Sequence, residues 1–353
     1  MPDLAVLDIG RYPTYQVFLV VVAALVAAGV LFPLWIRLVR FRNIGQQVRA
    51  DGPQGHLVKQ GTPTMGGVLI LLVVTAVFLL LGKVDRQSLL VLGTMLACGL
   101  LGFVDDYAKV VKERSLGLKP RAKIIWQVLI GCTFCLLAVN WGGLESHVRV
   151  PLASGYFDLG TLVSHVAVGA STIEVPWLYL GLVALMVVSA SNTVNLTDGL
   201  DGLAAGTVTI VMFAYAAIAF RQNHLEISLL GAAIAGACIG FLWYNSYPAD
   251  IFMGDTGSLG LGAAVAAMAV TTKTELLLPL IGGIYVMEGL SVLLQIVGYK
   301  LTRKRIFRMA PIHHHFEMKG WSETKVMVRF WIITGIMAGA GFALFFVQSV
   351  RKR

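Results

Sequence analysis

Ten runs of mostly apolar residues, separated by short polar stretches, limit what this chain folds into. A helix needs about 20 such residues to cross the hydrocarbon layer of a bilayer. The runs cover residues of about 15–38, 63–82, 88–104, 124–141, 176–190, 202–220, 227–244, 258–271, 276–300 and 326–348. Only 13% of the 353 residues are charged, whereas soluble domains carry about 25%. We therefore predict an all-α integral membrane protein with about ten transmembrane helices, forming one domain over residues 1–353.

The fifth and eighth runs are short for a membrane span. The neighbouring sequences NLTDGLDG and MGDTGSLG contain the glycine and aspartate residues that end or cap helices. Backbone outside helices is tolerated at membrane depth only where protein or a wet cavity covers it. We therefore expect helices here to begin inside loops that enter the protein.

Lysine and arginine are unevenly distributed over the connections, and this distribution predicts the orientation. The loops after the first, third and ninth runs hold most of them, and such loops face the cytoplasm. Both termini are then extracytoplasmic, although the basic residues 351–353 argue the other way. The predicted cytoplasmic loops cover residues of about 40–62, 105–123, 191–201, 245–257 and 301–325. The connection at about 142–175 lies outside, where we expect a small hairpin or a surface helix.

The net charge of +9 does not indicate a nucleic-acid partner. Basic loops between spanning segments attract anionic lipid or substrate instead. The four cysteines lie inside apolar runs, where thiols pack as small hydrophobes, so no disulfide framework is expected. Cys132 and Cys135 form a CxxC without a second pair nearby, which favours packing over metal or redox chemistry.

Four groups of polar residues lie at the ends of apolar runs, all on the predicted cytoplasmic side. They occupy residues 105–106, 195–201, 245–255 and 313–315. Carboxylates and imidazoles beside basic loops are typical of an active site for a phosphorylated substrate. We therefore predict a membrane enzyme with its cleft on the cytoplasmic face.

The acidic residues each allow a simple and a chemical interpretation. Asp105 and Asp106 repel each other, which favours a bound cation or a nearby lysine; solvation at the membrane edge is the alternative. Asp198 and Asp201 are three residues apart, which places both on one face of a beginning helix, although Asp198 also suits an N-cap. Asp255 precedes the eighth run, where it either caps a helix or holds Mg²⁺ together with phosphate oxygens and water.

Aromatic, imidazole and buried acidic side chains add to these candidates. Phe252 suits stacking on a nucleobase or a place at the membrane interface. On a helix His313, His314 and His315 fan out, so we expect hydrogen bonds to phosphate or sugar rather than one shared metal. Glu288 lies within the ninth run, where an ionisable group usually faces a cavity or a partner.

Several motifs together resemble the phospho-N-acetylmuramoyl-pentapeptide transferase family of peptidoglycan synthesis. They are DDYAKVVK, NLTDGLDGLA, MGDTGSLGLG and PIHHHFEMKGW, with KQGTPTMGG near residue 60. The likeness covers essentially the whole chain. The aspartate motifs are shared with the wider superfamily of polyprenyl-phosphate N-acetylhexosamine-1-phosphate transferases, and the histidine loop resembles this branch.

The resemblance implies a reaction, a cofactor and a setting. Phospho-MurNAc-pentapeptide passes from UDP-MurNAc-pentapeptide to undecaprenyl phosphate with Mg²⁺, releasing UMP and forming lipid I. The enzyme is then a multi-pass protein of the bacterial plasma (inner) membrane, in contact with membrane lipid and expected as a homodimer. Asp105, Asp106, Asp255 and His313 become catalytic, with Asp255 as the metal ligand. The residues expected to bind substrate are Lys59, Lys109, Lys123, Asn195, Asp198, Asp201, Asn245, Phe252, Gln295, His314 and His315.

Two mechanisms and two other functions stay open on the sequence. Either the lipid phosphate attacks directly, or an aspartate is the nucleophile and forms a covalent intermediate. A secondary transporter also uses broken helices and intramembrane acids such as Glu288, but the polar groups here gather at one face rather than at the midplane. A sister transferase that uses UDP-N-acetylglucosamine is the other alternative.

Overall fold

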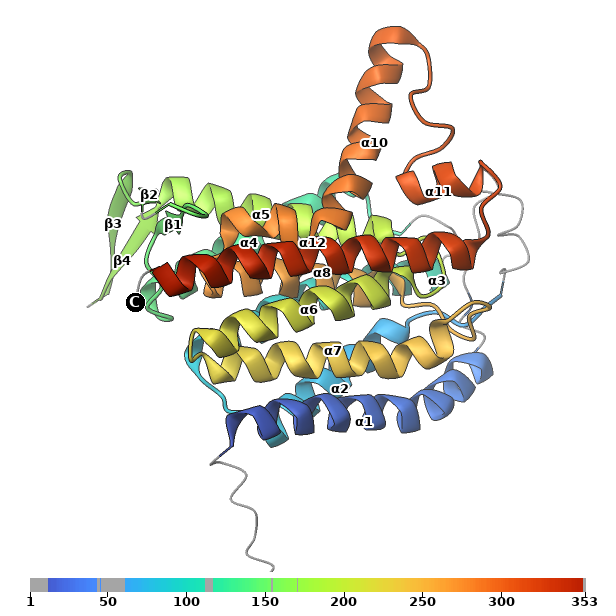
Figure 1. Cartoon of the computed structure of the whole chain (residues 1–353), viewed down its shortest axis with the longest axis horizontal. Helices are drawn as coiled ribbons and strands as arrows, with labels where there is room; N and C mark the ends of the chain where they lie inside the picture. The colour runs from blue at the N-terminus through green and yellow to red at the C-terminus, as the bar shows by residue number, and fades with distance from the viewer. Residues whose placement is uncertain are drawn as a thin grey trace, which may run out of the picture.

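The fold is a bundle of long helices with small strands at one end (Figure 1). It is known from a computed structural model that describes residues 12–42, 45, 61–111, 117–153, 155–169 and 171–351. Lys59 lies outside these residues. The first helices are α1 (Pro13–Phe41), α2 (Gly66–Leu81), α3 (Arg86–Val111) and α4 (Pro120–Asn140). The central ones are α5 (Trp177–Thr197), α6 (Leu203–Arg221), α7 (Leu225–Asn245) and α8 (Gly254–Thr271).

The last third of the chain is less regular. A 3₁₀ turn (Glu275–Leu277) and the short α9 (Leu278–Ile281) lead into α10 (Gly283–Thr302), followed by α11 (Ile312–Glu317) and α12 (Glu323–Arg351). In Figure 1, α10 leans out of the bundle. Its outer side exposes apolar residues such as Leu293 and Leu301, which is typical of contact with lipid.

The helices agree with the predicted runs in place, and most agree in length. Each predicted run falls on a helix, with α9 and α10 sharing the ninth. Eight helices within the described residues are long and apolar enough to cross a membrane, which makes the chain a multi-pass membrane protein. These eight are α1, α3, α4, α5, α6, α7, α10 and α12. The other two long helices are α2, which has 16 residues, and α8, whose first turns carry glycine and Asp255.

Helix α8 lies at the centre of the bundle. Residues 256–271 are all buried, and the helix contacts α2, α3, α5 and α6. Its many glycine and alanine residues allow other backbones to come close, as is common between membrane helices. Gly102 of α3 shows how close: a side chain there would collide with the carbonyl group of Asp255. This tight crossing fixes the start of α8 against α3.

Two local predictions are wrong. The fifth run was expected to be short, but α5 has 21 residues and continues to Thr197. It continues because its polar side chains find partners: Ser191 donates to the carbonyl oxygen of Val187, and Asn192 donates to Gln127. Asp198 and Asp201 were expected on a helix face, but they lie in the turn between α5 and α6.

The connection at about 142–175 forms two antiparallel hairpins. Strand β1 (His147–Arg149) pairs with β2 (Tyr156–Asp158), with His147 opposite Asp158. Strand β3 (Val163–Val168) pairs with β4 (Ser171–Pro176). These strands lie at the end of the bundle opposite α11 (Figure 1). The prediction of a small hairpin therefore holds, with two hairpins in place of one.

Candidate active site

Three carboxylates and two ammonium groups meet where α3, α4 and α8 converge. We call Asp105, Asp106, Lys109, Lys123 and Asp255 the aspartate–lysine centre. The Nζ atom of Lys109 lies 2.7 Å from Asp105 and 3.1 Å from Asp255. The Nζ atom of Lys123 lies 3.0 Å from Asp105 and 2.6 Å from Asp255. Side chains from the motifs DDYAKVVK and MGDTGSLGLG are thus in direct contact, together with Lys123.

Asp106 holds the first turn of α8. Its carboxylate accepts hydrogen bonds from the backbone N–H groups of Asp255 (3.0 Å) and Thr256 (2.9 Å), and from the Thr256 hydroxyl (2.8 Å). A negative charge at a helix N-terminus is also favoured by the helix dipole. Gly254 precedes these residues with a φ of 77°, and a Cβ atom there would lie 2.7 Å from Asp106. Asp106 therefore positions Asp255, and both of its oxygens are engaged.

The same carboxylates are a candidate metal site. Oxygens of Asp105, Asp106 and Asp255 lie within 4.8 Å of one another, and no other such group of three occurs among the described residues. Carboxylate oxygens are ligands that Mg²⁺ prefers. Asp105 Oδ2 is buried and accepts no directed hydrogen bond, although it is ion-paired with Lys109. This chemistry fits a divalent cation that shares its site with two lysines.

Neighbouring polar groups fix the centre from two further sides. Asn195, near the end of α5, donates to Asp255 (3.0 Å) and to Ser258 (2.8 Å). The backbone N–H of Leu118 donates to Asp105 at 2.6 Å. Asp255 is therefore held by α3, α4 and α5 at once.

The turn after α5 brings a fourth aspartate near the centre. Asp198 ends α5 and is half-buried. Desolvation raises the pKa of Asp198 well above its ordinary value, and the negative charges of Asp255, Asp106 and Asp201 raise it further. These like charges show that the NLTDGLDG turn and the aspartate–lysine centre share one electrostatic environment.

The three histidines of α11 have three different environments. His313 is fully buried, and its Nδ1 lies 3.0 Å from a carboxylate oxygen of Glu288 in α10. His314 pairs with Glu317 at 2.6 Å. His315 accepts a hydrogen bond from the backbone N–H of Arg308 at 3.1 Å. The fan-out expected from consecutive helix positions is therefore observed.

His313 also links α11 to the aspartate turn. Its Nε2 is buried and has no hydrogen-bond partner among the described residues. A side chain on Gly199 would collide with this ring, so the imidazole packs against the turn that carries Asp198 and Asp201. Glu288, inferred from sequence to face a partner, holds the opposite side of the ring.

Two predicted site residues, Asn245 and Asp201, make structural contacts that the sequence did not indicate. Asn245 accepts from the N–H of Gly202 and donates to the carbonyl group of Ile251. Asp201 accepts from the N–H of Ala249 at 3.0 Å. Together Asn245 and Asp201 tie the loop after α7 to the turn after α5. They therefore shape the site rather than only line it.

Gln295 and Phe252 lie at the margins of the site. Gln295 accepts from the N–H groups of Ile306 (3.1 Å) and Phe307 (2.9 Å), which fixes the connection from α10 to α11. Phe252 is half-buried, and its backbone N–H donates to the carbonyl group of Pro63 at 2.8 Å. Among the described residues, neither side chain forms a hydrogen bond with the aspartate–lysine centre.

Sequence reasoning missed two polar residues of the site. Glu317 follows His314 by three residues, the spacing at which helix side chains meet, so the motif HHHFE contained the signal. Thr256 directly follows Asp255, but nothing in the sequence pairs its hydroxyl with Asp106, which lies 150 residues earlier.

Carboxylates and ammonium groups in contact at one end of a membrane helix bundle suit an integral-membrane enzyme that acts on phosphates. Comparisons with known proteins make it a glycosyl transferase. A family model described as glycosyl transferase family 4 matches residues 88–273. A signature of the phospho-N-acetylmuramoyl-pentapeptide-transferases matches residues 59–71. The chain belongs to the phospho-N-acetylmuramoyl-pentapeptide-transferase family.

Relatives of that name match almost end to end. The Rubrobacter xylanophilus protein is 45% identical over 332 residues, covering 93% of this chain and 98% of its own. The Moorella thermoacetica protein is 46% identical, covering 92% of this chain and 96% of its own. The Pelobacter propionicus protein is 43% identical, covering 95% and 94%. Membership of a transferase family disfavours the secondary-transporter alternative.

Proposed function

We propose that this chain transfers phospho-MurNAc-pentapeptide from UDP-MurNAc-pentapeptide to undecaprenyl phosphate, giving lipid I and UMP. One observation carries the proposal: three carboxylates and two ammonium groups are in contact at one end of a membrane bundle. Phosphoryl transfer asks mainly for positioning and charge neutralisation, and this centre supplies both. The name of the relatives describes transfer of the same phospho-sugar.

Asp255 is the Mg²⁺ ligand in this proposal, with Asp105 beside it. Asp106 is less available because it already accepts three hydrogen bonds from the start of α8. Asn195 holds Asp255 in place from α5. When bound, the ion offsets the charge of a diphosphate and stabilises the departing UMP.

Lys109 and Lys123 neutralise the phosphates of the two substrates. Each ammonium is a point charge on a flexible stem, so it exchanges a carboxylate partner for a phosphate oxygen with little change of backbone. The two lysine side chains are 28% and 18% exposed, so both are accessible to an incoming anion. Asp105 touches both and keeps them at the centre.

The transfer is a single displacement. An oxygen of the lipid phosphate forms a bond to the sugar-bearing phosphorus, and the bond from that phosphorus to the bridging oxygen breaks. UMP leaves with the electron pair. A phosphate monoester with a second pKa of about 6 is mostly dianionic at neutral pH, so the acceptor needs orientation more than it needs a base.

The competing mechanism uses an aspartate as the nucleophile. Asp106 is poorly placed for this role because both of its oxygens are bound to the start of α8. Intact-protein mass spectrometry separates the two mechanisms. The protein is first incubated with UDP-MurNAc-pentapeptide in the absence of the lipid acceptor. Direct attack leaves the protein mass unchanged, whereas a phospho-sugar adduct would contradict it.

The remaining predicted residues form the donor side of the cleft. Asp198 and Phe252 take the nucleotide, and Asn195 holds the metal ligand Asp255. The histidines of α11 contact phosphate or sugar, with His313 pressed against the NLTDGLDG turn. Gln295 keeps α11 in position through the backbone of residues 306–307.

The site faces the cytoplasm of a bacterial inner membrane in this proposal, and the enzyme acts as a homodimer. The support for the orientation is the excess of lysine and arginine in the connections at this end. Mg²⁺-dependent release of UMP by the purified protein tests the function. We expect UMP from UDP-MurNAc-pentapeptide only when undecaprenyl phosphate is present. UMP formed equally well from UDP-N-acetylglucosamine would favour the sister transferase.

A further inference from the structure

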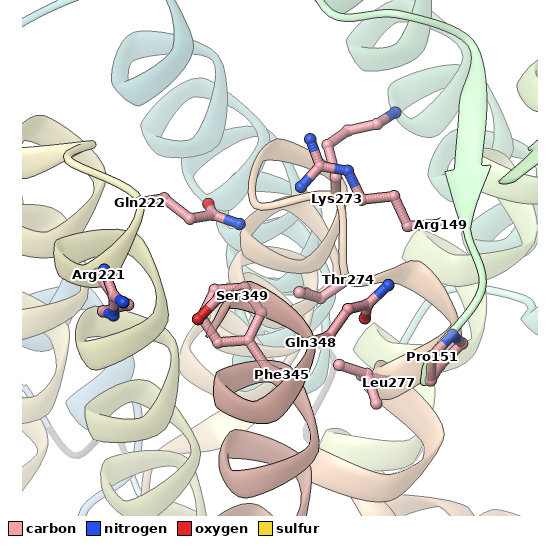
Figure 2. A pocket seen from close by; sticks show the side chains of 10 residues that line it. All are labelled: Arg149, Pro151, Arg221, Gln222, Lys273, Thr274, Leu277, Phe345, Gln348 and Ser349. Carbon is pink, nitrogen blue, oxygen red and sulfur yellow. The ribbon is translucent and has the colours of Figure 1, made fainter. Parts of the chain in front are cut away.

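A basic hollow lies at the end of the bundle opposite the aspartate–lysine centre. It is lined by β1, the end of α6, the turn after α8 and the last turns of α12 (Figure 2). Arg149, Arg221 and Lys273 contribute three positive charges. Helix α8 has 18 residues between the two sites, which corresponds to about 27 Å at about 1.5 Å per residue. The hollow is therefore separate from the candidate active site.

Only one of the three cations is neutralised. The Nζ atom of Lys273 lies 3.2 Å from the carboxylate of Glu275 and donates to the Tyr179 hydroxyl and to the carbonyl group of Glu145. Arg149 and Arg221 have no ion pair or side-chain hydrogen bond with any described residue. Two guanidinium groups thus face the hollow with unused donors.

Nearby contacts keep these charges in place. The guanidinium carbon of Arg221 lies 5.4 Å from the centre of the Phe346 ring, a cation–π distance. Burial lowers the pKa of Lys273, and the positive charge of Arg149 lowers it further. Arg149 is therefore close enough to Lys273 for their charges to add to one positive field.

The size and walls of the hollow indicate the kind of ligand. Its volume is about 210 Å³, below the roughly 300–1,000 Å³ of pockets for drug-sized molecules. Leu277 and Phe345 give it apolar walls, and Thr274 is also buried at its lining. A small anionic group attached to an apolar body fits this combination.

We propose that the hollow binds the headgroup of an anionic phospholipid. It lies at the ends of the apolar helices α6 and α12, where lipid headgroups meet a spanning bundle. Guanidinium groups pair with phosphate through two parallel hydrogen bonds, and basic pockets between spanning helices hold anionic headgroups. Zwitterionic lipids are disfavoured because their ammonium group meets the same cations.

The bound lipid joins three elements that are far apart in the chain. Arg149 belongs to β1, Arg221 ends α6, and Ser349 lies in the last turns of α12. A headgroup bound in the hollow therefore connects the hairpin region to the ends of α6 and α12. The site does not depend on the transferase reaction, so its test is independent of the proposed function.

Lipid binding by a double variant tests the proposal. In Arg149→Gln/Arg221→Gln both unpaired charges are removed from side chains that are not buried. The matched control is Lys83→Gln/Arg86→Gln, which removes two exposed charges at the same end, outside the hollow. Native mass spectrometry of the detergent-purified proteins, titrated with phosphatidylglycerol or phosphatidylcholine, reports affinity and headgroup preference.

We expect the hollow variant to bind phosphatidylglycerol about 30-fold more weakly, or about fivefold for each arginine. The control keeps wild-type affinity, and phosphatidylcholine binding is the same in all three proteins. Equal phosphatidylglycerol affinity in the hollow variant and the control, with unchanged melting temperatures, would overturn the proposal. A third arm adds inorganic phosphate: if free phosphate binds the wild type and leaves lipid binding unaffected, the hollow is a free-anion site instead.

Discussion

Removing the carboxylate of Glu288 is expected to impair His313, the imidazole that it contacts. Both side chains are fully buried, and the Nδ1 of His313 lies 3.0 Å from Glu288. The contact of Nδ1 with Glu288 leaves Nε2 as the nitrogen that faces the Gly199 turn. Glu288 thus sets the orientation of this imidazole.

The magnitude follows from the burial of the pair. A buried polar group left without its partner costs about 1–3 kcal/mol. If the orientation of His313 that supports catalysis is destabilised by this free energy, kcat falls about 5- to 150-fold. Glu288→Ala should therefore lose activity in this range, with a smaller change in the KM for UDP-MurNAc-pentapeptide. Glu288→Gln should recover most of it, because its amide can still form a hydrogen bond with Nδ1.

Steady-state UMP release, measured beside the melting temperature, is the assay. Glu226→Gln is the control, since Glu226 lies in the first turn of α7, at the opposite end of the bundle. A folded Glu288→Ala protein with the kcat of the wild type would refute the reasoning. Equal loss in the Ala and Gln variants would instead mean that charge, rather than the hydrogen bond, is what His313 requires.

Two further substitutions test the electrostatics and the packing. Asp198→Asn should raise the melting temperature in magnesium-free buffer at pH 8, because a carboxyl group whose pKa is raised by folding costs stability once it ionises. The gain should vanish toward a pH of about 4. A gain that is the same at every pH would contradict this origin. Gly102→Ala should lower both stability and UMP release, because the new side chain meets the carbonyl group of Asp255. The control is Gly93→Ala in the same helix, whose side chain meets nothing within 4 Å. The control should be neutral or stabilising by up to about 1 kcal/mol. Similar melting curves for the two alanine variants would show that the crossing of α3 and α8 is looser than described.

Apolar periodicity was enough to place the helices. The ten predicted runs each fall on a helix because a spanning segment must satisfy its own backbone, whatever its neighbours are. The ends were harder to predict. The fifth apolar run ended at about residue 190. Asn192 and Asn195 nevertheless find partners in Gln127 and Asp255, and the helix continues to Thr197.

Motifs identified the aspartates, but their partners are distant in sequence. Asp106 and Thr256 are 150 residues apart, and no local pattern predicts that a carboxylate of α3 caps α8. In the same way Glu288 suggested a buried partner without naming His313, 25 residues later. Asn245 was expected in the cleft, whereas the structure shows it bonded to the backbone of Gly202 and Ile251. Such contacts depend on how the helices cross, which composition does not encode.

The central claim is that the aspartate–lysine centre performs the transfer. The most direct test titrates Mg²⁺ in the UMP-release assay and compares the wild type with Asp255→Ala. If the aspartate–lysine centre performs the transfer, wild-type activity rises with Mg²⁺ and disappears with a chelator. Asp255→Ala should then lose about 100-fold or more at every Mg²⁺ concentration while its melting temperature stays within a few degrees. Wild-type rates from a folded Asp255→Ala protein would place the chemistry elsewhere in the molecule.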